Sequence, residues 1–521
     1  CLCLASVFAF NFSQDYFEVS KNLDIFNTLY RELNIAYVDE TKPGQLMKTG
    51  IEAMLNSLDP YTNYYTENDI EDYRFMTTGE YGGIGALIQD VNNKITVTEP
   101  YETFAAYKAG LRAGDEIIEV NGVNVSGKKT EDITTMLKGQ AGTPIKLKII
   151  RLGQTTSSEV SLTREEIKVK AVPYYEMLNA EVGYIKLTSF TDNCSGEVKE
   201  ALVKLKEKNC KSLILDLRGN PGGLLHEAVN IVNLFVEKNN EVVSTRGKVK
   251  DWNKQYFSLY APVDTQIPLV VLVDNNSASA SEIVSGALQD LDRAVIMGQR
   301  SYGKGLVQQT RPLTYNAQLK VTVAKYYIPS GRCIQALDYT HKDEDGRVEK
   351  VPDSLITAFK TKNGRTIYDG AGILPDVKTE DVKYSNLLIT LLNRNHIFTY
   401  VNSYILKHPE YNAASLNTAF SDNDYNDFIN YLKDKDYKYK TQSDFALEDL
   451  KLDASNEKYY ESIKDEYEAL LNKMVSNKKD DLMRFKPEIK QFIEEELASR
   501  FMFQKGRIET ALKYDLEVIE A

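Results

Sequence analysis

The sequence predicts a multidomain α/β protein, and three observations support this prediction. Between about residues 180 and 330, short apolar strands alternate with helical segments, a pattern typical of parallel α/β units. Residues 77–165 instead contain short strands separated by glycine turns, which favours a small β domain. Apolar residues recur at helical spacing near both ends of the chain. A chain of 521 residues is long enough for about three to four domains.

The composition is that of a globular protein, with 42% hydrophobic and 26% charged residues. The 75 acidic residues outnumber the 63 lysines and arginines, which gives a net charge of −12. Because the chain also lacks a basic block, nucleic acid is not an expected partner. Beyond the N-terminus no apolar run approaches about 18 residues, so we expect no membrane-spanning helix in the body of the protein.

The first nine residues are apolar and resemble the end of a secretory signal peptide. Val7 and Ala9 fit the small-residue rule for cleavage after Ala9, although the charged start of a signal is missing. We therefore expect residues 1–9 to be a signal remnant and the protein to be secreted across the inner membrane into the periplasm. A truncated buried strand or a membrane anchor stays open, and Cys3 is a candidate for lipidation.

Cleavage after Ala9 would leave three cysteines, Cys194, Cys210 and Cys333. Cys194 and Cys210 flank a predicted helix over residues 195–208, which would be about 21 Å long. A disulfide needs Cα atoms about 5.5 Å apart, so these two cannot pair. We expect three free thiols, no metal site and no cofactor.

Residues 10–75 are predicted to form a helical segment. One helix follows from apolar residues at helical spacing, which are Leu23, Phe26, Leu29, Leu33 and Tyr37. A second helix over residues 45–58 should end before Pro60, because proline cannot continue a helix.

The next segment, residues 76–165, holds a glycine-rich turn at residues 82–85 that leads into a strand. Further strands are expected at residues 95–97 and 145–150, and a helix at residues 130–137. Between them the chain reads Gly-Leu-Arg-Ala-Gly-Asp-Glu-Ile-Ile-Glu-Val-Asn-Gly from residue 110. In this order the motifs resemble a PDZ domain; the other interpretation is an unrelated small β domain with a tight turn.

The PDZ resemblance implies a site for the C-terminus of a peptide. A glycine turn leaves successive backbone N–H groups free to hold a terminal carboxylate, and the edge of the following strand can accept an extended peptide. The residues implied are Gly83, Ile84, Gly85, Ala86 and Ile88. Because the side chains of Ile84, Ala86 and Ile88 would line the pocket, we expect an apolar C-terminal residue in the ligand.

Four apolar strands are predicted in the α/β region, at residues 182–187, 212–217, 268–273 and 294–297. The second is almost continuously apolar, which is typical of a strand buried on both faces. A glycine-rich loop follows this strand and leads into a helix, whereas a serine cluster and a further helix follow the third strand.

Ser279 lies at the predicted junction between the third strand and its helix. Such a position places the hydroxyl at a helix N-terminus, where backbone N–H groups and the helix dipole favour developing negative charge. It also places the N–H of Ala280 beside the serine oxygen. The alternative is that Ser279, with Glu282 three residues on, only caps the helix.

Lys304 could activate this serine. The pKa of a lysine side chain is about 10.4, and lysine acts as a base at neutral pH only where burial lowers that pKa. Gly303 and Gly305 let the backbone approach closely, so a neutral Lys304 could take the proton of Ser279. Gln308 could orient the lysine through its amide group; the alternative is a polar side chain that faces solvent.

Two other chemistries fit these segments less well. A phosphate-binding loop would need serine or threonine after Lys304, but Gly305 stands there and an extended segment follows. A Ser-His-Asp triad would need a nucleophile elbow, and the sequence contains no Gly-x-Ser-x-Gly. The chain has four histidines, of which His226 is expected on the helix after the glycine-rich loop.

Seven motifs follow one another along the chain, at residues 58–62, 183–190, 216–223, 277–282, 303–305, 327–332 and 372–377. Together they resemble the carboxyl-terminal processing (tail-specific) peptidase family, over about residues 20–380 and with the PDZ segment where that family has it. The resemblance implies a peptidase core over residues 166–379, with an α/β fold like that of the crotonase and Clp-type peptidases.

The same resemblance implies a Ser-Lys dyad. It assigns the nucleophile to Ser279 rather than to Ser277 or Ser281, the base to Lys304, and a supporting role to Gln308.

It also implies an oxyanion hole made by the backbone N–H groups of Ala280 and of the turn at Gly222 and Gly223, without deciding between the two glycines. Asp290 matches an acidic position of the family whose role is either structural or catalytic. Cys333 departs from the family, which usually has a small polar residue there.

Residues 380–521 are predicted to be all-helical. Amphipathic helices are expected near residues 387–401, 459–471 and 489–497. We find no catalytic motif in this region, and it resembles no element of the peptidase family that we can place. Contacts in a homo-oligomer or with an adaptor are candidate roles for the helical regions.

The sequence therefore predicts a serine endopeptidase that captures a protein or peptide substrate by its apolar free C-terminus and cleaves it upstream. A non-catalytic PDZ scaffold that only binds peptides is the main alternative, and a crotonase-like acyl transferase is a third. Binding without cleavage would favour the scaffold.

Overall fold

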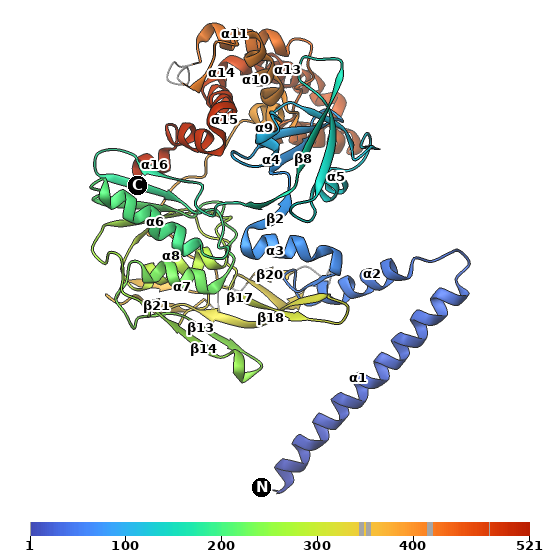
Figure 1. Cartoon of the computed structure of the whole chain (residues 1–521), viewed down its shortest axis with the longest axis vertical. Coiled ribbons are helices and arrows are strands. Elements are labelled where there is room, and N and C mark those ends of the chain that lie inside the picture. Colours follow the sequence, from blue (N-terminus) through green and yellow to red (C-terminus); the bar gives the residue numbers. More distant parts are fainter. Residues whose placement is uncertain (1, 343–347, 351–355, 414–419, 479) are drawn as a thin grey trace. The chain divides into compact units, whose positions relative to one another are not determined.

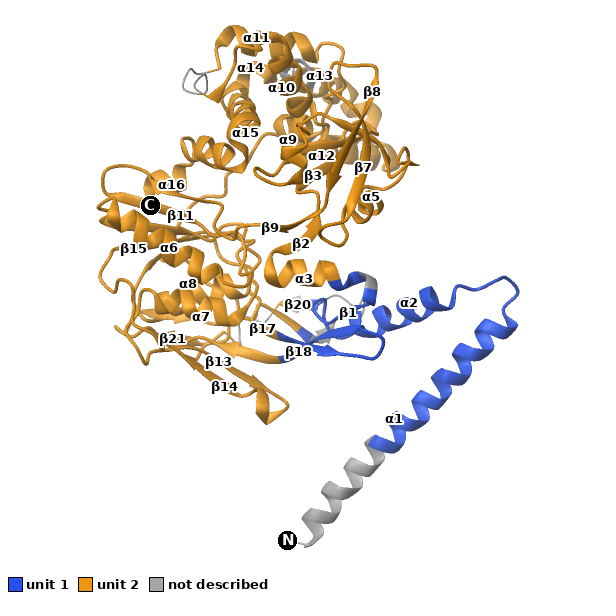
Figure 2. Ribbon diagram, viewed as in Figure 1, with its two compact units in different colours: residues 1–70, 308–323, 339–349 blue, residues 71–307, 324–338, 350–521 orange. Residues whose placement is uncertain are grey.

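The computed structural model describes residues 2–342, 348–350, 356–413, 420–478 and 480–521 of the chain (Figure 1). It divides into two compact units (Figure 2). The first unit holds residues 1–70, 308–323 and 339–349, and the second holds residues 71–307, 324–338 and 350–521. The candidate catalytic residues Ser279 and Lys304 belong to the second unit.

The first unit begins with two helices, α1 (Leu2–Ala36) and α2 (Pro43–Asn56). After α2, Asp59 accepts the backbone N–H groups of Tyr61 and Thr62, each at 2.8 Å, and so turns the chain at Pro60 as expected. Strand β1 (Asn63–Tyr65) then pairs antiparallel with β18 (Gln318–Tyr327). The predicted signal remnant corresponds to the start of α1, apart from Cys1, which lies outside the described residues. Among the described helices, none combines the length and apolar character that crossing a membrane requires.

The β domain of the second unit is a sheet in the order β3-β4-β5-β7-β8. Its strands are β3 (Ala86–Asp90), β4 (Ile95–Pro100), β5 (Glu116–Val120), β6 (Val123–Asn124), β7 (Pro144–Ile150) and β8 (Ser157–Thr163). Two short helices, α4 (Ala105–Lys108) and α5 (Thr130–Leu137), complete the domain, and α5 packs next to β3. Strand β3 is at the end of the sheet order, so one of its edges is open within the described part of the domain. The expected strands and helix of the PDZ-like segment are all present.

The antiparallel pair β2 (Glu80–Gly83) and β9 (Glu165–Lys168) lies where the chain enters and leaves the domain, and α3 (Ile70–Thr78) precedes β2. Its apolar core includes Val97, Ile117 and Ile145, each almost fully buried. The alternation of buried and exposed residues along β7 shows that only one face of this strand packs inward.

The α/β core is a six-stranded sheet in the order β10-β11-β12-β15-β16-β23. The strands are β10 (Tyr174–Met177), β11 (Val182–Lys186), β12 (Ser212–Asp216), β15 (Leu269–Val273), β16 (Val295–Gly298) and β23 (Val377–Lys378). All pairs are parallel except β10 with β11, which confirms the predicted parallel α/β units.

Helices cover both faces of this sheet. Residues of α6 (Cys194–Glu207), α7 (Leu225–Asn233) and α8 (Ala280–Asp290) pack on the face that carries Leu215 and Val271. The opposite face carries Tyr184, Ile214 and Leu272, and it is covered by Val518 near the end of the chain. A second sheet contains β13 (Glu241–Gly247), β14 (Lys254–Phe257), β17 (Leu306–Pro312) and β18.

The C-terminal region is helical, as predicted. It consists of α9 (Asn386–Asn393), α10 (His396–Lys407), α11 (Asp422–Leu432), α12 (Gln442–Asn456), α13 (Tyr460–Lys478), α14 (Asp481–Arg484), α15 (Lys486–Leu512) and α16 (Leu516–Glu520). The single helix expected over residues 387–401 is wrong, because Asn395 adopts a left-handed conformation (φ +56°) and separates α9 from α10. Helix α15 is also interrupted, at Phe503 (φ +52°, ψ −147°).

The three cysteines whose side chains the structure describes, Cys194, Cys210 and Cys333, are free thiols as expected. Cys194 and Cys210 lie at opposite ends of α6, which keeps them apart.

Candidate active site

Ser279 lies in a tight turn between β15 and α8. Its backbone dihedral angles (φ +55°, ψ −109°) lie outside the regions usually allowed for residues that have a side chain, so the turn is strained. Asp274 holds the preceding loop by accepting the N–H of Ser277 at 2.9 Å and the N–H of Gly219 at 2.9 Å. The turn that carries the serine is therefore tied to the glycine-rich loop after β12.

The hydroxyl groups of the two neighbouring serines, Ser277 and Ser281, donate hydrogen bonds to backbone carbonyls. Ser277 is fully buried and donates its hydroxyl to the carbonyl of Leu217 at 2.9 Å. Ser281 is also fully buried and donates its hydroxyl to the carbonyl of Asn220 at 2.9 Å. Both hydroxyls brace the loop between residues 217 and 220, whereas Ser279 is only partly buried.

Glu282 links the Ser279 turn to the segment that carries Lys304. Its carboxylate is fully buried, and its Oε2 atom accepts the backbone N–H of Ser279 at 2.8 Å and that of Lys304 at 2.9 Å. Its Oε1 atom accepts the N–H of Gly303 at 2.7 Å and the hydroxyl of Ser301 at 2.6 Å. Burial raises the pKa of Glu282, although these hydrogen bonds act in the opposite direction. The sequence pattern indicates only a helix-capping role for Glu282.

The loop at Gly222 and Gly223 lies directly against the Ser279 turn. A Cβ atom on Gly222 (φ +97°) would come within 2.6 Å of the carbonyl oxygen of Ala278 and 2.9 Å of the backbone nitrogen of Ala280. Phe190 holds the other side of the loop, because its N–H donates to Gly222 at 3.1 Å and its carbonyl accepts from Leu224 at 2.8 Å.

The N–H groups of this loop are not equivalent. Gly222 donates its N–H to the side-chain oxygen of Asn220 at 2.9 Å. Among the residues that the structure describes, no acceptor takes the N–H of Gly223 or that of Ala280. These two groups are therefore available to a ligand.

Asp216 and Arg218 form a buried ion pair at the start of the same loop. Asp216 accepts from the Arg218 guanidinium at 2.7 Å and 3.0 Å and from the hydroxyl of Tyr184 at 2.6 Å, and Lys186 lies 3.1 Å away. Burial alone would raise the pKa of Asp216, but the charges of Lys186 and Arg218 and the hydrogen bonds hold it well below its usual range. Both residues belong to the motif at residues 216–223, but the sequence alone indicates no role for either.

Gln308 lies in β17, in the first unit. Its side-chain amide donates to the hydroxyl of Thr322 at 3.1 Å, and the backbone N–H of Thr322 donates to the hydroxyl of Thr62 at 3.2 Å. This network fixes the side chain of Gln308. Its role toward Lys304 stays a prediction.

Asp290 lies at the end of α8 and is paired with Arg332. The two side chains are buried, with Asp290 accepting from the guanidinium at 2.8 Å and from the N–H of Ser330 at 2.9 Å. Asp290 therefore fixes the turn after β18, which favours the structural alternative for this residue.

In the β domain, the turn at Ile84 and Gly85 has the features of a carboxylate site. Both carbonyls accept backbone N–H groups, from Ala106 and Tyr101 at 2.8 Å each, but within the described residues no acceptor takes the N–H of Ile84 or Gly85. Ala86 and Ile88 pack partly buried against the domain core. The side chain of Ile84 is only 2% exposed, so it belongs to the core and does not line an open pocket as expected from sequence.

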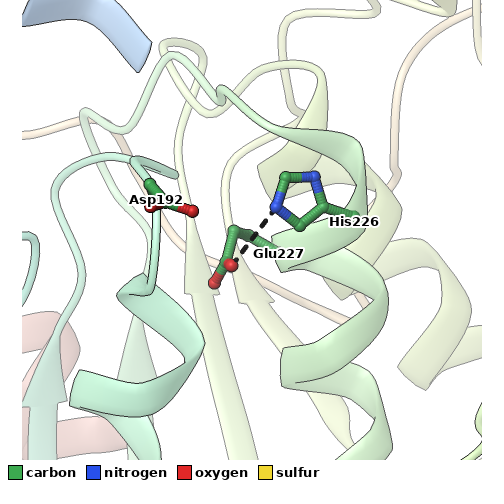
Figure 3. A group of neighbouring side chains, drawn as sticks. All are labelled: Asp192, His226 and Glu227. Carbon is green, nitrogen blue, oxygen red and sulfur yellow. Dashed lines mark ion pairs between the residues drawn. The ribbon is translucent and has the colours of Figure 1, made fainter. Parts of the chain in front are cut away.

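Within the part of the chain that the structure describes, one group of side chains could hold a metal ion. Asp192, His226 and Glu227 bring one ligand atom each within 4.8 Å of one another (Figure 3). Glu227 already accepts the N–H groups of Ser195 at 2.7 Å and Asn193 at 3.3 Å, and His226 lies 3.4 Å from it. Because Glu227 caps the N-terminus of α6 in this way, we assign it a structural role.

This fold, with a serine turn facing a glycine loop and a separate PDZ-like domain, defines a serine-type peptidase. Residues 181–342 match "Peptidase family S41", residues 96–151 match "PDZ domain", and residues 387–521 match "Probable PDZ-protease, C-terminal helical domain". The last match gives a family context to the helical region that sequence analysis could not place.

Curated relatives support the same family assignment. The chain is 38% identical over 324 residues to the "Carboxy-terminal-processing protease" of Bartonella bacilliformis, and the matched residues make up 61% of this chain and 74% of the relative. It is 34% identical over 360 residues to the "Probable CtpA-like serine protease" of Staphylococcus aureus, which covers 69% of this chain and 68% of the relative. Among solved structures, the photosystem II D1 C-terminal processing protease is 26% identical, covers 68% of this chain and 92% of its own, and has a TM-score of 0.36.

The chain belongs to the S41 family of carboxy-terminal processing serine peptidases.

Proposed function

We propose that the protein hydrolyses peptide bonds with Ser279 as the nucleophile and Lys304 as the general base, on substrates whose free C-terminus is held by the PDZ domain. One observation carries the dyad. A single atom, Oε2 of Glu282, accepts the backbone N–H groups of both Ser279 and Lys304, at 2.8 Å and 2.9 Å. Two residues that are 25 positions apart are thereby held on one buried carboxylate.

The chemistry follows from these two residues. Neutral Lys304 takes the proton of the Ser279 hydroxyl as the serine oxygen attacks the carbonyl carbon of the substrate. The resulting tetrahedral intermediate collapses, and the proton passes from Lys304 to the leaving amine. Water then hydrolyses the ester on Ser279 by the same exchange of protons, which restores the free serine.

The negative oxygen of the intermediate is stabilised by the N–H groups of Gly223 and Ala280. This assignment is supported by the hydrogen bonds of the loop, since Gly222 donates its N–H to Asn220 while the other two have no acceptor in the described residues. Preorganised N–H donors of this kind are worth about 10²–10³ in kcat each. Gly222 contributes by its lack of a side chain, which lets the loop approach Ser279.

The PDZ domain captures the substrate C-terminus at the turn between β2 and β3. The N–H groups of Ile84 and Gly85 receive the terminal carboxylate, and the open edge of β3 pairs with the residues before it. Ala86 and Ile88, on the inward face of β3, form part of an apolar surface for the last side chain. In this scheme Ile84 acts through its backbone and not through its side chain.

Two further parts of the proposal rest on the sequence and on the family resemblance. The apolar start of the chain is the ground for placing the protein in the periplasm. By analogy with the family, the PDZ domain would gate the active site, so that peptide binding completes the dyad.

Cleavage of a globular protein with an unstructured apolar C-terminal tail tests the dyad. Wild type should cleave it, and Ser279→Ala and Lys304→Ala should each lower kcat by at least about 10³. Ser281→Ala removes a buried structural hydroxyl and should keep the chemistry, and Lys362→Ala, an exposed lysine, should match wild type. Undiminished cleavage by either dyad variant contradicts the mechanism.

Binding of the tail without cleavage by wild type would favour a PDZ scaffold. Transfer of an acyl group from a thioester, without proteolysis, would favour a crotonase-like acyl transferase. Activity should also rise between about pH 6 and 9 as the base loses its proton, and a flat profile would count against a lysine base.

A further inference from the structure

The loop after β12, residues 217–223, carries one of the two proposed oxyanion donors, Gly223, and is called the oxyanion loop below; the C-terminal region holds it in place. Arg218, the second residue of the loop after β12, donates from Nη1 to Glu517 at 2.6 Å and to Asp515 at 3.1 Å, and from Nη2 to Asp515 at 2.7 Å. Asp515 caps α16 by accepting the N–H of Val518 at 3.1 Å, and Glu517 lies in α16. Nearly 300 residues separate these partners in the sequence.

The contact between Arg218 and the carboxylates of Asp515 and Glu517 is largely buried. The side chain of Arg218 is 16% exposed and that of Glu517 is 9% exposed, so the charges are largely removed from water. An arginine has five N–H donors in a rigid plane, and here both Asp216 on one side and the α16 carboxylates on the other use them. The guanidinium is therefore fixed in position and orientation.

Helix α16 is anchored beside Arg218 by apolar packing. Val518 packs with Tyr184, Ile214 and Leu272 on the face of the core sheet opposite α8. Glu517 also accepts the hydroxyl of Thr379, just after β23. The packing of α16 against the sheet thus holds the carboxylates of Asp515 and Glu517 in position.

Fixing Arg218 fixes the loop after it. Its carbonyl accepts the ammonium group of Lys186 at 2.9 Å, and the next residue, Gly219, donates its N–H to Asp274 at 2.9 Å. Only three residues then lie between Gly219 and Gly223. A shift of Arg218 would therefore move the backbone that faces Ser279.

The same C-terminal segment is attached to the PDZ domain. Helix α15 leads to α16 and can be followed in Figure 1. At its interruption, Phe503 makes an edge-to-face contact with Tyr107 of α4, with ring centres 5.5 Å apart. One turn later Arg507 pairs with the mostly buried Glu99 at 3.2 Å. Glu99 lies in β4 directly opposite Leu87 of β3, the strand whose edge would receive the substrate.

We propose that residues 503–517 form a positioning strut between the PDZ domain and the oxyanion loop, which holds Arg218 through Asp515 and Glu517 and is itself held by the PDZ domain through Arg507. This inference rests on the proposed function, because it assigns the strut a role in that reaction. Asp515 and Glu517 are positioning residues that act through Arg218. A change in β3 and β4 on peptide binding would reach the loop along this segment.

The loop end of the strut is tested by the double variant Asp515→Asn/Glu517→Gln in the full-length protein. We expect kcat to fall about 10-fold to 100-fold, because small displacements of catalytic groups have effects of this size. KM and the Kd of a tail peptide should stay within about 2-fold, since the PDZ groove is untouched. Glu520→Gln, on the exposed side of the same helix, is the matched control and should equal wild type.

A double-mutant cycle separates positioning from general destabilisation. If the carboxylates act through Arg218, the double variant should cause little further loss of kcat in an Arg218→Gln background. Full additivity of the two effects, or wild-type kcat in Asp515→Asn/Glu517→Gln, would overturn the proposal. A lower melting temperature with unchanged kcat below the transition would also overturn it, since it would show a purely structural contact.

The contact between the strut and the PDZ domain is tested by Arg507→Gln, with the exposed Lys513→Gln as the control. The readout is the ratio of cleavage rates for a tailed substrate and for the same substrate with an amidated C-terminus. Arg507→Gln should bring this ratio closer to one, and an unchanged ratio would remove the PDZ end from the proposal. Ser279→Ala, measured alongside, tests the proposed function itself. Activity retained by Ser279→Ala would contradict the dyad. Activity lost in Ser279→Ala but unchanged in the strut variants would contradict the strut alone.

Discussion

A Cβ atom on Gly222 would lie 2.8 Å from the Cβ of Ser279, closer than folded proteins allow. The oxyanion loop and the serine turn are thus in contact backbone to backbone, and any side chain at position 222 would separate them. This contact, together with the carboxylate of Glu282, defines the distances on which the proposed chemistry depends.

Gly222→Ala should therefore lose most of its activity. The new methyl group would collide with the carbonyl of Ala278, and alanine is strained at φ +97°. We expect kcat to fall about 100-fold or more, as for loss of an oxyanion donor. Gly219→Ala is the matched control, because it has a similar strain at φ +71° but open space around its Cβ position. Equal kcat losses in both variants would show that backbone strain, and not the close approach, is what matters.

Glu282→Gln tests the link between Ser279 and Lys304. If Oε2 becomes the NH₂ group, it faces two backbone N–H donors, those of Ser279 and Lys304. If Oε1 becomes the NH₂ group, it faces the N–H donor of Gly303, and the hydroxyl of Ser301 would have to turn and accept from it. At least one hydrogen bond therefore becomes a contact between donors. We expect a loss of stability of about 2–3 kcal/mol and a fall in kcat of at least about 10-fold in the folded protein. Denaturant titration and kinetics measure the two effects, with exposed Glu207→Gln as the control. Normal kcat in Glu282→Gln would contradict a linking role.

Asp290→Asn distinguishes a structural from a catalytic role for this residue. Arg332 is 1% exposed, and its buried charge would lose its ionic partner. Breaking such a pair costs about 3–5 kcal/mol, which chemical denaturation would detect. Because Asp290 contacts the turn after β18 and not the serine, kcat per folded molecule should stay close to wild type. Asp436→Asn, in an exposed pair with Arg394, should cost no more than about 1 kcal/mol. A large fall in kcat with normal stability would instead make Asp290 catalytic.

Much of the fold could be predicted because it depends on local sequence patterns. The alternation of strands and helices, the glycine turns and the serine at a helix start all depend on residues close in the sequence. The break at Asn395 was missed because the apolar spacing continues across it, and only the left-handed backbone of that asparagine interrupts the helix.

The contacts that organise the site were not predictable in the same way. The sequence indicates a capping role for Glu282, but its hydrogen bonds to Gly303 and Lys304 depend on the return of the chain 21 and 22 residues later. The pairing of Arg218 with Asp515 and Glu517 joins distant segments, and nothing in a sequence with 75 acidic residues singles out these two.

The pKa of Asp216 predicts how stability depends on pH. Because the pKa is lowered in the folded state, the ionised carboxylate stabilises the fold at pH values above its unfolded pKa of about 3.9. This stabilisation is lost as the pH falls below that value toward the folded pKa. The difference in unfolding free energy between wild type and Asp216→Asn should be constant between about pH 5 and 7 and shrink below about pH 4. A difference that stays constant down to about pH 2.5 would refute the assigned shift.

Gly85→Ala should strongly weaken the proposed capture of the substrate C-terminus. Gly85 has φ +73°, and a Cβ atom there would come within 2.5 Å of the Cβ of Phe104, so the turn would have to open and its free N–H groups would move. Gly110→Ala is a matched control in the same domain, with φ +78° and open space at its Cβ position. Fluorescence anisotropy with an apolar tail peptide should show at least about 10-fold weaker binding for Gly85→Ala and normal binding for Gly110→Ala. Amidation of the peptide should weaken binding to wild type by a similar factor, because the carboxylate is the group that the N–H donors hold. Equal binding of the acid and the amide would mean that the domain reads internal sequence and not a chain end.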